Sequence, residues 1–135
     1  MSQPRRAADS AAQDSVDLAY LERFGDAWNR HDVDAILAQM TADCVVLASV
    51  GENEDGACHV GQDAVRRGIT AFFEAYPDAH FESLGAFVAG ARGLSEWRFT
   101  ATRNDGLRIR ALGCDVFTFE GGRIKIKNAF RKQRP

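Results

Sequence analysis

The stretch ALGCDVFTFEGGRI, residues 111–124, predicts a β-strand that carries one acid on an otherwise apolar face, followed by a tight turn. Side chains of a strand point to opposite faces with a period of two residues. Extended back to residue 107, the alternation puts one set of residues on a common face: Leu107, Ile109, Ala111, Gly113, Asp115, Phe117 and Phe119. Asp115 is the polar residue of this set, and folding draws its carboxyl group toward apolar surroundings.

Burial of Asp115 leaves three alternatives, because a carboxylate is costly to bury unless it is paired or protonated. A β-bulge turns the side chain outward, or a partner such as an arginine on a neighbouring strand satisfies it. In the third alternative, Asp115 lines a cavity, with space left by Ala111 and Gly113 on one side and the apolar rings of Phe117 and Phe119 on the other. An acid in such a cavity is suited to donating or shuttling a proton.

The composition is that of an ordinary globular domain: 135 residues, 45% hydrophobic, 27% charged and a net charge of −2. No apolar run approaches the ~18–20 residues that span a bilayer, and nothing suggests nucleic-acid binding. We expect a mobile leader over residues 1–14 and a single domain over residues 15–135. The cysteines, Cys44, Cys58 and Cys114, are odd in number and lack CxxC spacing, which favours free thiols and a cytoplasmic location.

Three helices are predicted in the first part of the chain. In SVDLAYLERFGDAWNRHD (residues 15–32), apolar residues recur at helical spacing, with Asp14 or Ser15 as the N-cap. Asp32 caps a short second helix. After a strand over residues 44–50 and a polar loop over residues 51–61, a third helix runs until Pro77 ends it.

From residue 80 onward the period changes to two, which predicts four strands: 80–89, 94–103, 107–120 and 123–131. Asp105-Gly106 and Gly121-Gly122 are strong hairpin signals between them. Helices followed by an antiparallel meander indicate an α+β fold. We expect three helices packed in a strongly curved, mainly antiparallel sheet.

Other residues offer weaker evidence of a site. His59 lies in the predicted loop, where a histidine is either simply solvated or, at the mouth of a cavity, functional. Phe24, Trp28 and Trp97 are expected to face inward, as core residues or as cavity walls. The three histidines show no metal-ligand spacing, so neither a metal nor a cofactor is expected.

Three segments in this order resemble the SnoaL-like branch of the nuclear transport factor 2-like superfamily. They are FGDAWNRHDVDAILAQMTADCVV (24–46), GQDAVRRGITAFF (61–73) and LGCDVFTFEGGRIKI (112–126). The resemblance extends over about residues 16–131. It implies a cone-shaped α+β roll with a hydrophobic cavity, and homodimers that pair through the outer sheet face, here Leu112, Cys114 and Val116.

The resemblance also supplies three catalytic models. Asp115 falls on the acid/base position of SnoaL-like polyketide cyclases, and on the oxyanion-hole aspartate of ketosteroid isomerases. The isomerase base corresponds to Ala48 and its tyrosine to Phe24, so that activity is not expected. Limonene epoxide hydrolases need an Asp-Arg-Asp set, for which this chain offers Arg98 but no acid at Thr100 or Asn128.

We therefore expect a protein that binds a hydrophobic small molecule without a cofactor. Asp115, with His59 as a second candidate, would perform acid/base catalysis of the cyclisation or isomerisation type on a carbonyl compound. The residues expected to bind substrate are Phe24, Trp28, Trp97, Phe117, Ala48 and Asn128. The alternative is a non-catalytic ligand-binding or dimeric interaction domain.

Overall fold

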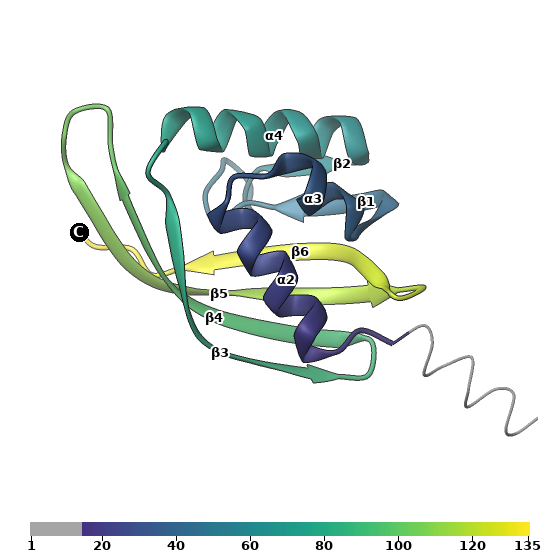
Figure 1. The fold of residues 1–135 in the computed structure, drawn as a ribbon. Coiled ribbons are helices and arrows are strands. Elements are labelled where there is room, and N and C mark those ends of the chain that lie inside the picture. The colour runs from purple at the N-terminus through teal and green to yellow at the C-terminus, as the bar shows by residue number, and fades with distance from the viewer. Residues whose placement is uncertain (1–14) are drawn as a thin grey trace, which may run out of the picture.

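The computed structural model describes residues 15–135, which form three helices and six strands (Figure 1). The leader expected over residues 1–14 lies outside this range, as does Asp14. The helices are α2 (Leu18–Asn29), α3 (Val33–Ala38) and α4 (Gln62–Ala75). The strands are β1 (Met40–Leu47), β2 (Cys58–Val60), β3 (His80–Ala89), β4 (Arg92–Thr102), β5 (Arg108–Glu120) and β6 (Arg123–Arg131).

The helix boundaries follow from capping. Asp17, rather than Asp14 or Ser15, caps α2, because its carboxylate accepts a hydrogen bond from the backbone N–H of Tyr20 at 2.8 Å. Asp32 caps α3 as predicted, accepting from the N–H of Ala35. The α4 helix ends at Ala75, two residues before Pro77, which cannot continue a helix.

The strands form one six-stranded sheet in the order β2-β1-β6-β5-β4-β3. All neighbours are antiparallel except β1 and β6, which are parallel, so the prediction of a mainly antiparallel sheet is confirmed. Two predictions were wrong in detail. Residues 58–60, expected in a loop, form β2, and the first strand covers Met40–Leu47 instead of residues 44–50.

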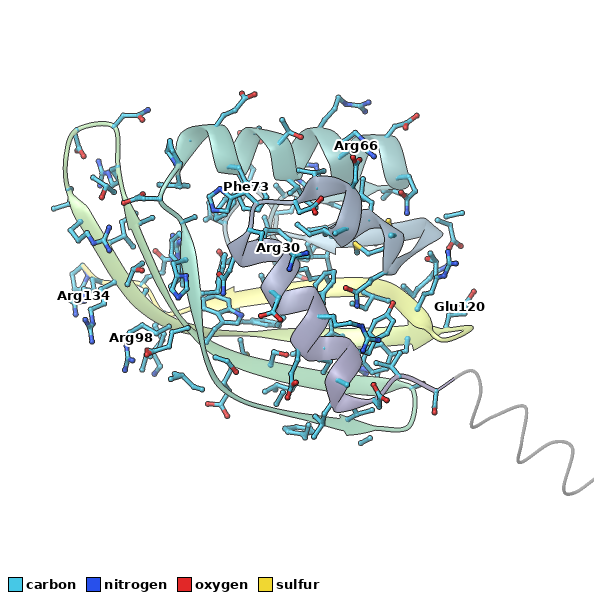
Figure 2. All side chains as sticks on the ribbon, in the orientation of Figure 1. Arg30, Arg66, Phe73, Arg98, Glu120 and Arg134 are labelled. Atoms are coloured by element: carbon cyan, nitrogen blue, oxygen red, sulfur yellow. The ribbon has the colours of Figure 1, made fainter. Side chains whose placement is uncertain are left out.

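The helices cover the concave face of the curved sheet, where the core lies (Figure 1). Side chains from α4, Phe73 among them, fill the space between that helix and α2 (Figure 2). On the sheet side, Phe117 and Phe119 are buried as the alternation predicted, and Asp115 is buried with them at 7% exposure. Asp115 therefore faces inward, and no bulge turns it outward.

A β-bulge in the β5–β6 pair decides which residues of β6 face inward. Thr118 pairs with Ile126 and Phe119 with Ile124, so one residue of β6, Lys125, has no opposite residue. Strict alternation from Ile124 would place Asn128 inside. The extra residue shifts the pattern by one, and Lys127 is buried instead.

Gly113 of β5 makes room for the Trp97 side chain on the neighbouring strand. The two residues are directly paired, and a Cβ at Gly113 would lie 2.4 Å from the Trp97 ring and 2.4 Å from the carbonyl oxygen of Phe130. These distances are far shorter than van der Waals contacts. The absence of a side chain at Gly113 therefore fixes where Trp97 lies.

We predict that Gly113→Ala lowers the free energy of unfolding by about 1–3 kcal/mol, because the added methyl group overpacks the site. Gly25→Ala is the matched control. A Cβ at Gly25, inside α2, meets no atom within 4 Å, so alanine stabilises the helix by about 0.5–1 kcal/mol. Urea unfolding monitored by circular dichroism measures both. A Gly113→Ala protein as stable as wild type would contradict this packing.

Candidate functional site

Asp115 forms a buried ion pair with Lys127. The Lys127 Nζ atom lies 3.0 Å from Asp115 Oδ1, and the two side chains are only 8% and 10% exposed. The second carboxylate oxygen, Oδ2, accepts a hydrogen bond from Trp97 Nε1 at 3.2 Å. The alternative of a partner on a neighbouring strand is therefore realised, and Asp115 also lines a cavity. The partner is a lysine rather than an arginine.

Lys127 is the functional candidate that sequence reasoning missed. It follows Ile124 and Ile126 in an apolar alternation that assigns lysines to the solvent face, and only the bulge brings its side chain inside. Its ammonium lies over the Trp28 ring, with Nζ 4.5 Å from the ring centroid, a cation–π distance. The Trp28 Nε1–H is itself buried, and among residues 15–135 it has no hydrogen-bond acceptor.

One cavity in the described part of the chain, here called the Asp115 cavity, has a volume of about 380 Å³. It lies between α2 and strands β3, β4 and β5, and Asp115 and Lys127 both line it. Four aromatic residues predicted to bind substrate also line it: Phe24, Trp28, Trp97 and Phe117. Phe24 packs edge-on against both Trp28 and Phe117, at centroid distances of 6.3 and 5.8 Å.

The second cavity, here called the α4 cavity, has a volume of about 310 Å³ and lies between α4 and the sheet. Ala48 and His59 line it, whereas Asp115 does not. Ala48 and His59 are thus separated from Asp115, although two other predicted site residues line both cavities. The wall shared by the two cavities consists of Trp28, Phe81, Trp97 and Lys127.

His59 lies on β2, paired with Val46, and not in a loop as predicted. Its imidazole packs against α4 at Gly68, where a Cβ would lie 2.8 Å from the ring. A glycine inside a helix costs up to about 1 kcal/mol relative to alanine. The histidine ring occupies the space that a larger residue would need.

Asn128 does not line either interior cavity of the described chain. The bulge in β6 directs it to the opposite face of the sheet, where it borders a groove with Leu112, Cys114 and Phe130. Asn128, predicted to bind substrate, therefore lies on the other face of the sheet from the Asp115 cavity. Burial raises the pKa of the Cys114 thiol in this groove, and the charge of Asp115 raises it further.

Within residues 15–135, Cys44, Cys58 and Cys114 are free, and no group of three or more His, Cys, Asp or Glu side chains is arranged to hold a metal ion. None of the helices in this range has the length and apolarity that crossing a bilayer requires. The described residues that line the two cavities carry carboxylate, ammonium, guanidinium, imidazole and aromatic groups.

The family model of the SnoaL-like domain matches residues 21–126, most of the described chain. The chain belongs to the SnoaL-like domain family. This assignment agrees with the α+β architecture and with the order of the motifs along the chain. No protein of curated function matches the sequence.

Solved structures with the same fold are similar over most of their length. A nuclear transport factor 2-like protein of unknown function from Mesorhizobium loti is 26% identical, with a TM-score of 0.70, and 93% of each chain is covered. A cystatin-fold protein from Novosphingobium aromaticivorans is 24% identical, with a TM-score of 0.71, over 88% of this chain and 99% of that one. A protein from Xanthomonas campestris, provisionally assigned as a polyketide cyclase, is 17% identical, with a TM-score of 0.74, over 83% and 87%.

We predict that removing either partner of the buried pair alone destabilises the SnoaL-like domain more than removing both. Asp115→Leu leaves an ammonium group buried without its carboxylate, and Lys127→Met leaves the carboxylate without its cation. Each change should lower the free energy of unfolding by about 3–5 kcal/mol. The double variant replaces the pair by apolar side chains and should lower it by less than either single change. Denaturant unfolding of the four proteins gives the double-mutant cycle. If the losses of unfolding free energy in the two single variants add up in the double variant, the two charges do not stabilise each other and the prediction is wrong.

Proposed function

We propose that this SnoaL-like protein binds a hydrophobic carbonyl compound in the Asp115 cavity and transfers a proton at the carbon next to the carbonyl group. The observation that supports it is the buried Asp115–Lys127 pair, which lines a cavity walled by aromatic rings. Ligand cavities are typically apolar with a few polar groups that orient the ligand. Here the polar groups form a base and a hydrogen-bond donor side by side.

The proposed step uses both groups at once. Lys127 donates a hydrogen bond to the carbonyl oxygen, while a carboxylate oxygen of Asp115 accepts the proton from the adjacent carbon. The electrons of the broken C–H bond move to the oxygen and form an enolate, which the ammonium group stabilises. An ammonium group has three N–H donors, and the pair with Asp115 occupies one of them. The enolate then takes the proton back from Asp115 at carbon, or its carbon attacks a second carbonyl group of the same molecule in a cyclisation and the new alkoxide takes that proton. Either route regenerates the Asp115 carboxylate.

A specific observation favours a second candidate function, that of a non-catalytic ligand-binding protein. Both oxygens of Asp115 already accept a hydrogen bond, one from Lys127 and one from Trp97. Asp115 can accept a proton from a substrate only by giving up one of these hydrogen bonds. In that case the pair serves as a polar anchor for the ligand.

The neighbouring residues support neither of the other family chemistries. Ala48, which corresponds to the isomerase base, has no acid group, and Phe24 replaces the isomerase tyrosine. Thr100 and Asn128 likewise provide no acid for the hydrolase set. The proposed reaction needs no metal or organic cofactor, because the acidity of the substrate and the Lys127 donor carry it.

We also propose a homodimer that pairs through the outer face of the sheet. Three large apolar side chains on that face are exposed: Phe87 at 57%, Leu112 at 42% and Phe130 at 53%. They border one groove together with Cys114, and the family resemblance implies pairing through this face. A second copy would cover apolar area that a monomer leaves in water.

Proton transfer is tested with 2-tetralone, an aromatic ketone, by following exchange of its α-hydrogens in D₂O by proton NMR. We expect the wild-type protein to accelerate the exchange. Asp115→Asn should lower that acceleration by about 10²–10⁴-fold, the usual contribution of a general base. Asp115→Glu retains a charge for Lys127 but displaces the oxygens, so it should fold while losing most of the acceleration.

Asp26→Asn is the matched control for this experiment, since Asp26 also lines the Asp115 cavity but is exposed on α2. Its exchange rate should equal that of wild type. If 2-tetralone binds to the wild-type protein and its exchange rate is the same with and without Asp115, the protein is a binder and not a catalyst. If the Asp26 and Asp115 variants lose the acceleration of exchange equally, Asp115 is not a specific base.

The dimer is tested by analytical ultracentrifugation at micromolar concentration. Wild type should sediment at twice the 14.8 kDa mass of the chain, and Leu112→Glu should sediment as a monomer, because the new charge would be buried between the copies. Leu18→Glu, at a similarly exposed leucine on α2, should remain dimeric. A monomeric wild-type protein would refute the proposal.

A further inference from the structure

The α4 cavity differs from the Asp115 cavity in the charges that line it. Its titratable cationic and imidazole side chains are those of His59, Lys127 and Arg131, and no carboxylate is among its lining residues. The Asp115 cavity has the opposite balance. The carboxylates that line it are those of Glu22, Asp26, Glu82, Glu96 and Asp115, against the ammonium group of Lys127 and the imidazole of His80.

Arg131 is a partly buried cation without a counter-charge. Its guanidinium carbon lies 5.2 Å from the centroid of the Phe99 ring, a stacking contact that holds the side chain in place. Within residues 15–135, no carboxylate forms an ion pair with it. Glu54, Asp55 and Glu96 border the groove that adjoins Arg131 on the outer face, yet none of them pairs with it. Its hydrogen-bond donors are therefore available to a ligand.

Lys127 and His59 add donors at two further points of the same cavity. Lys127 engages one carboxylate, so part of its donor capacity remains. The imidazole of His59 is partly buried against Gly68 and makes no hydrogen bond within the described part of the chain. Three positions, one on β2 and two on β6, thus present donors to a space whose lining residues include no carboxylate.

The rest of the α4 cavity is apolar. Its walls are formed mainly by the rings of Trp28, Phe72, Tyr76, Phe81, Trp97 and Phe99. Its volume of about 310 Å³ lies within the range of small-molecule sites, which begins at about 300 Å³. Aromatic walls with an unpaired arginine suit a molecule that is apolar at one end and anionic at the other.

We infer that the α4 cavity is a second ligand site, which binds a hydrophobic carboxylate. The planar guanidinium of Arg131 holds the carboxylate through paired hydrogen bonds, the geometry that arginine favours. The apolar part of the ligand packs against the aromatic walls toward Trp28 and Trp97. This site does not require proton transfer in the Asp115 cavity, and the two proposals can fail separately.

The test compares 4-phenylbutyrate with 4-phenylbutanamide, a neutral molecule of nearly the same shape, by isothermal titration calorimetry. We expect wild type to bind the carboxylate about tenfold more tightly than the amide. A hydrogen bond to a charged group is stronger than a neutral one, and the difference in free energy corresponds to about that factor in the dissociation constant. Arg131→Gln should weaken carboxylate binding about tenfold and leave amide binding unchanged. The fluorescence of Trp28 and Trp97, the two tryptophans of the chain, should change on binding.

Arg123→Gln is the matched control, since it removes the same charge from an exposed position of the same strand. It should bind both compounds as wild type does. Arg131→Lys keeps the charge but loses the planar fork, and it should retain an intermediate affinity for the carboxylate. Equal binding of carboxylate and amide by wild type would overturn the inference, and so would equal losses in the Arg131→Gln and Arg123→Gln proteins. The comparison of the two compounds on wild type needs no variant, so it tests the proposal even if a variant fails to fold.

Discussion

The buried pair of Asp115 and Lys127 is the constraint on which the interior of this protein depends. Removing two charges from water is costly, and their attraction offsets that cost only with good geometry and further hydrogen bonds. The structure supplies both, through the Trp97 N–H on one carboxylate oxygen and the Trp28 ring under the ammonium group. The need to satisfy this pair therefore positions two tryptophans, and Gly113 has to be small so that one of them fits.

The bulge in β6 and the ion pair depend on each other. Without the extra residue, alternation would direct Lys127 to the solvent and Asn128 to the interior, because a slip of one residue exchanges the faces of a strand. Asp115 would then be buried without a cation. The pair in turn favours the bulged register over the regular one, since only the bulged register satisfies the carboxylate. A local irregularity of the backbone and a long-range electrostatic contact thus specify the same arrangement.

Periodicity predicted much of the fold because it reports burial directly. The alternation around Asp115 correctly placed it on the inner face with Phe117 and Phe119, and the helical spacing placed Phe24 and Trp28 inward. The partner of Asp115 was not predictable in this way, because the bulge in β6 interrupts the two-residue alternation from which burial is predicted. His59 was misassigned for a different reason. The three residues of β2 form a strand only through pairing with β1, and so short a segment has no periodicity of its own.

Lys127 belongs to the wall between two cavities of opposite charge, and this position links the two proposals. Its ammonium group is held by Asp115 on one side and faces a space without carboxylates on the other. A carboxylate bound in the α4 cavity would compete with Asp115 for the same donors. The more strongly Lys127 turned toward that ligand, the weaker its hydrogen bond to Asp115 would become. An occupant of the α4 cavity would in this way compete with the proton transfer proposed for its neighbour, because that step also needs the Lys127 ammonium group.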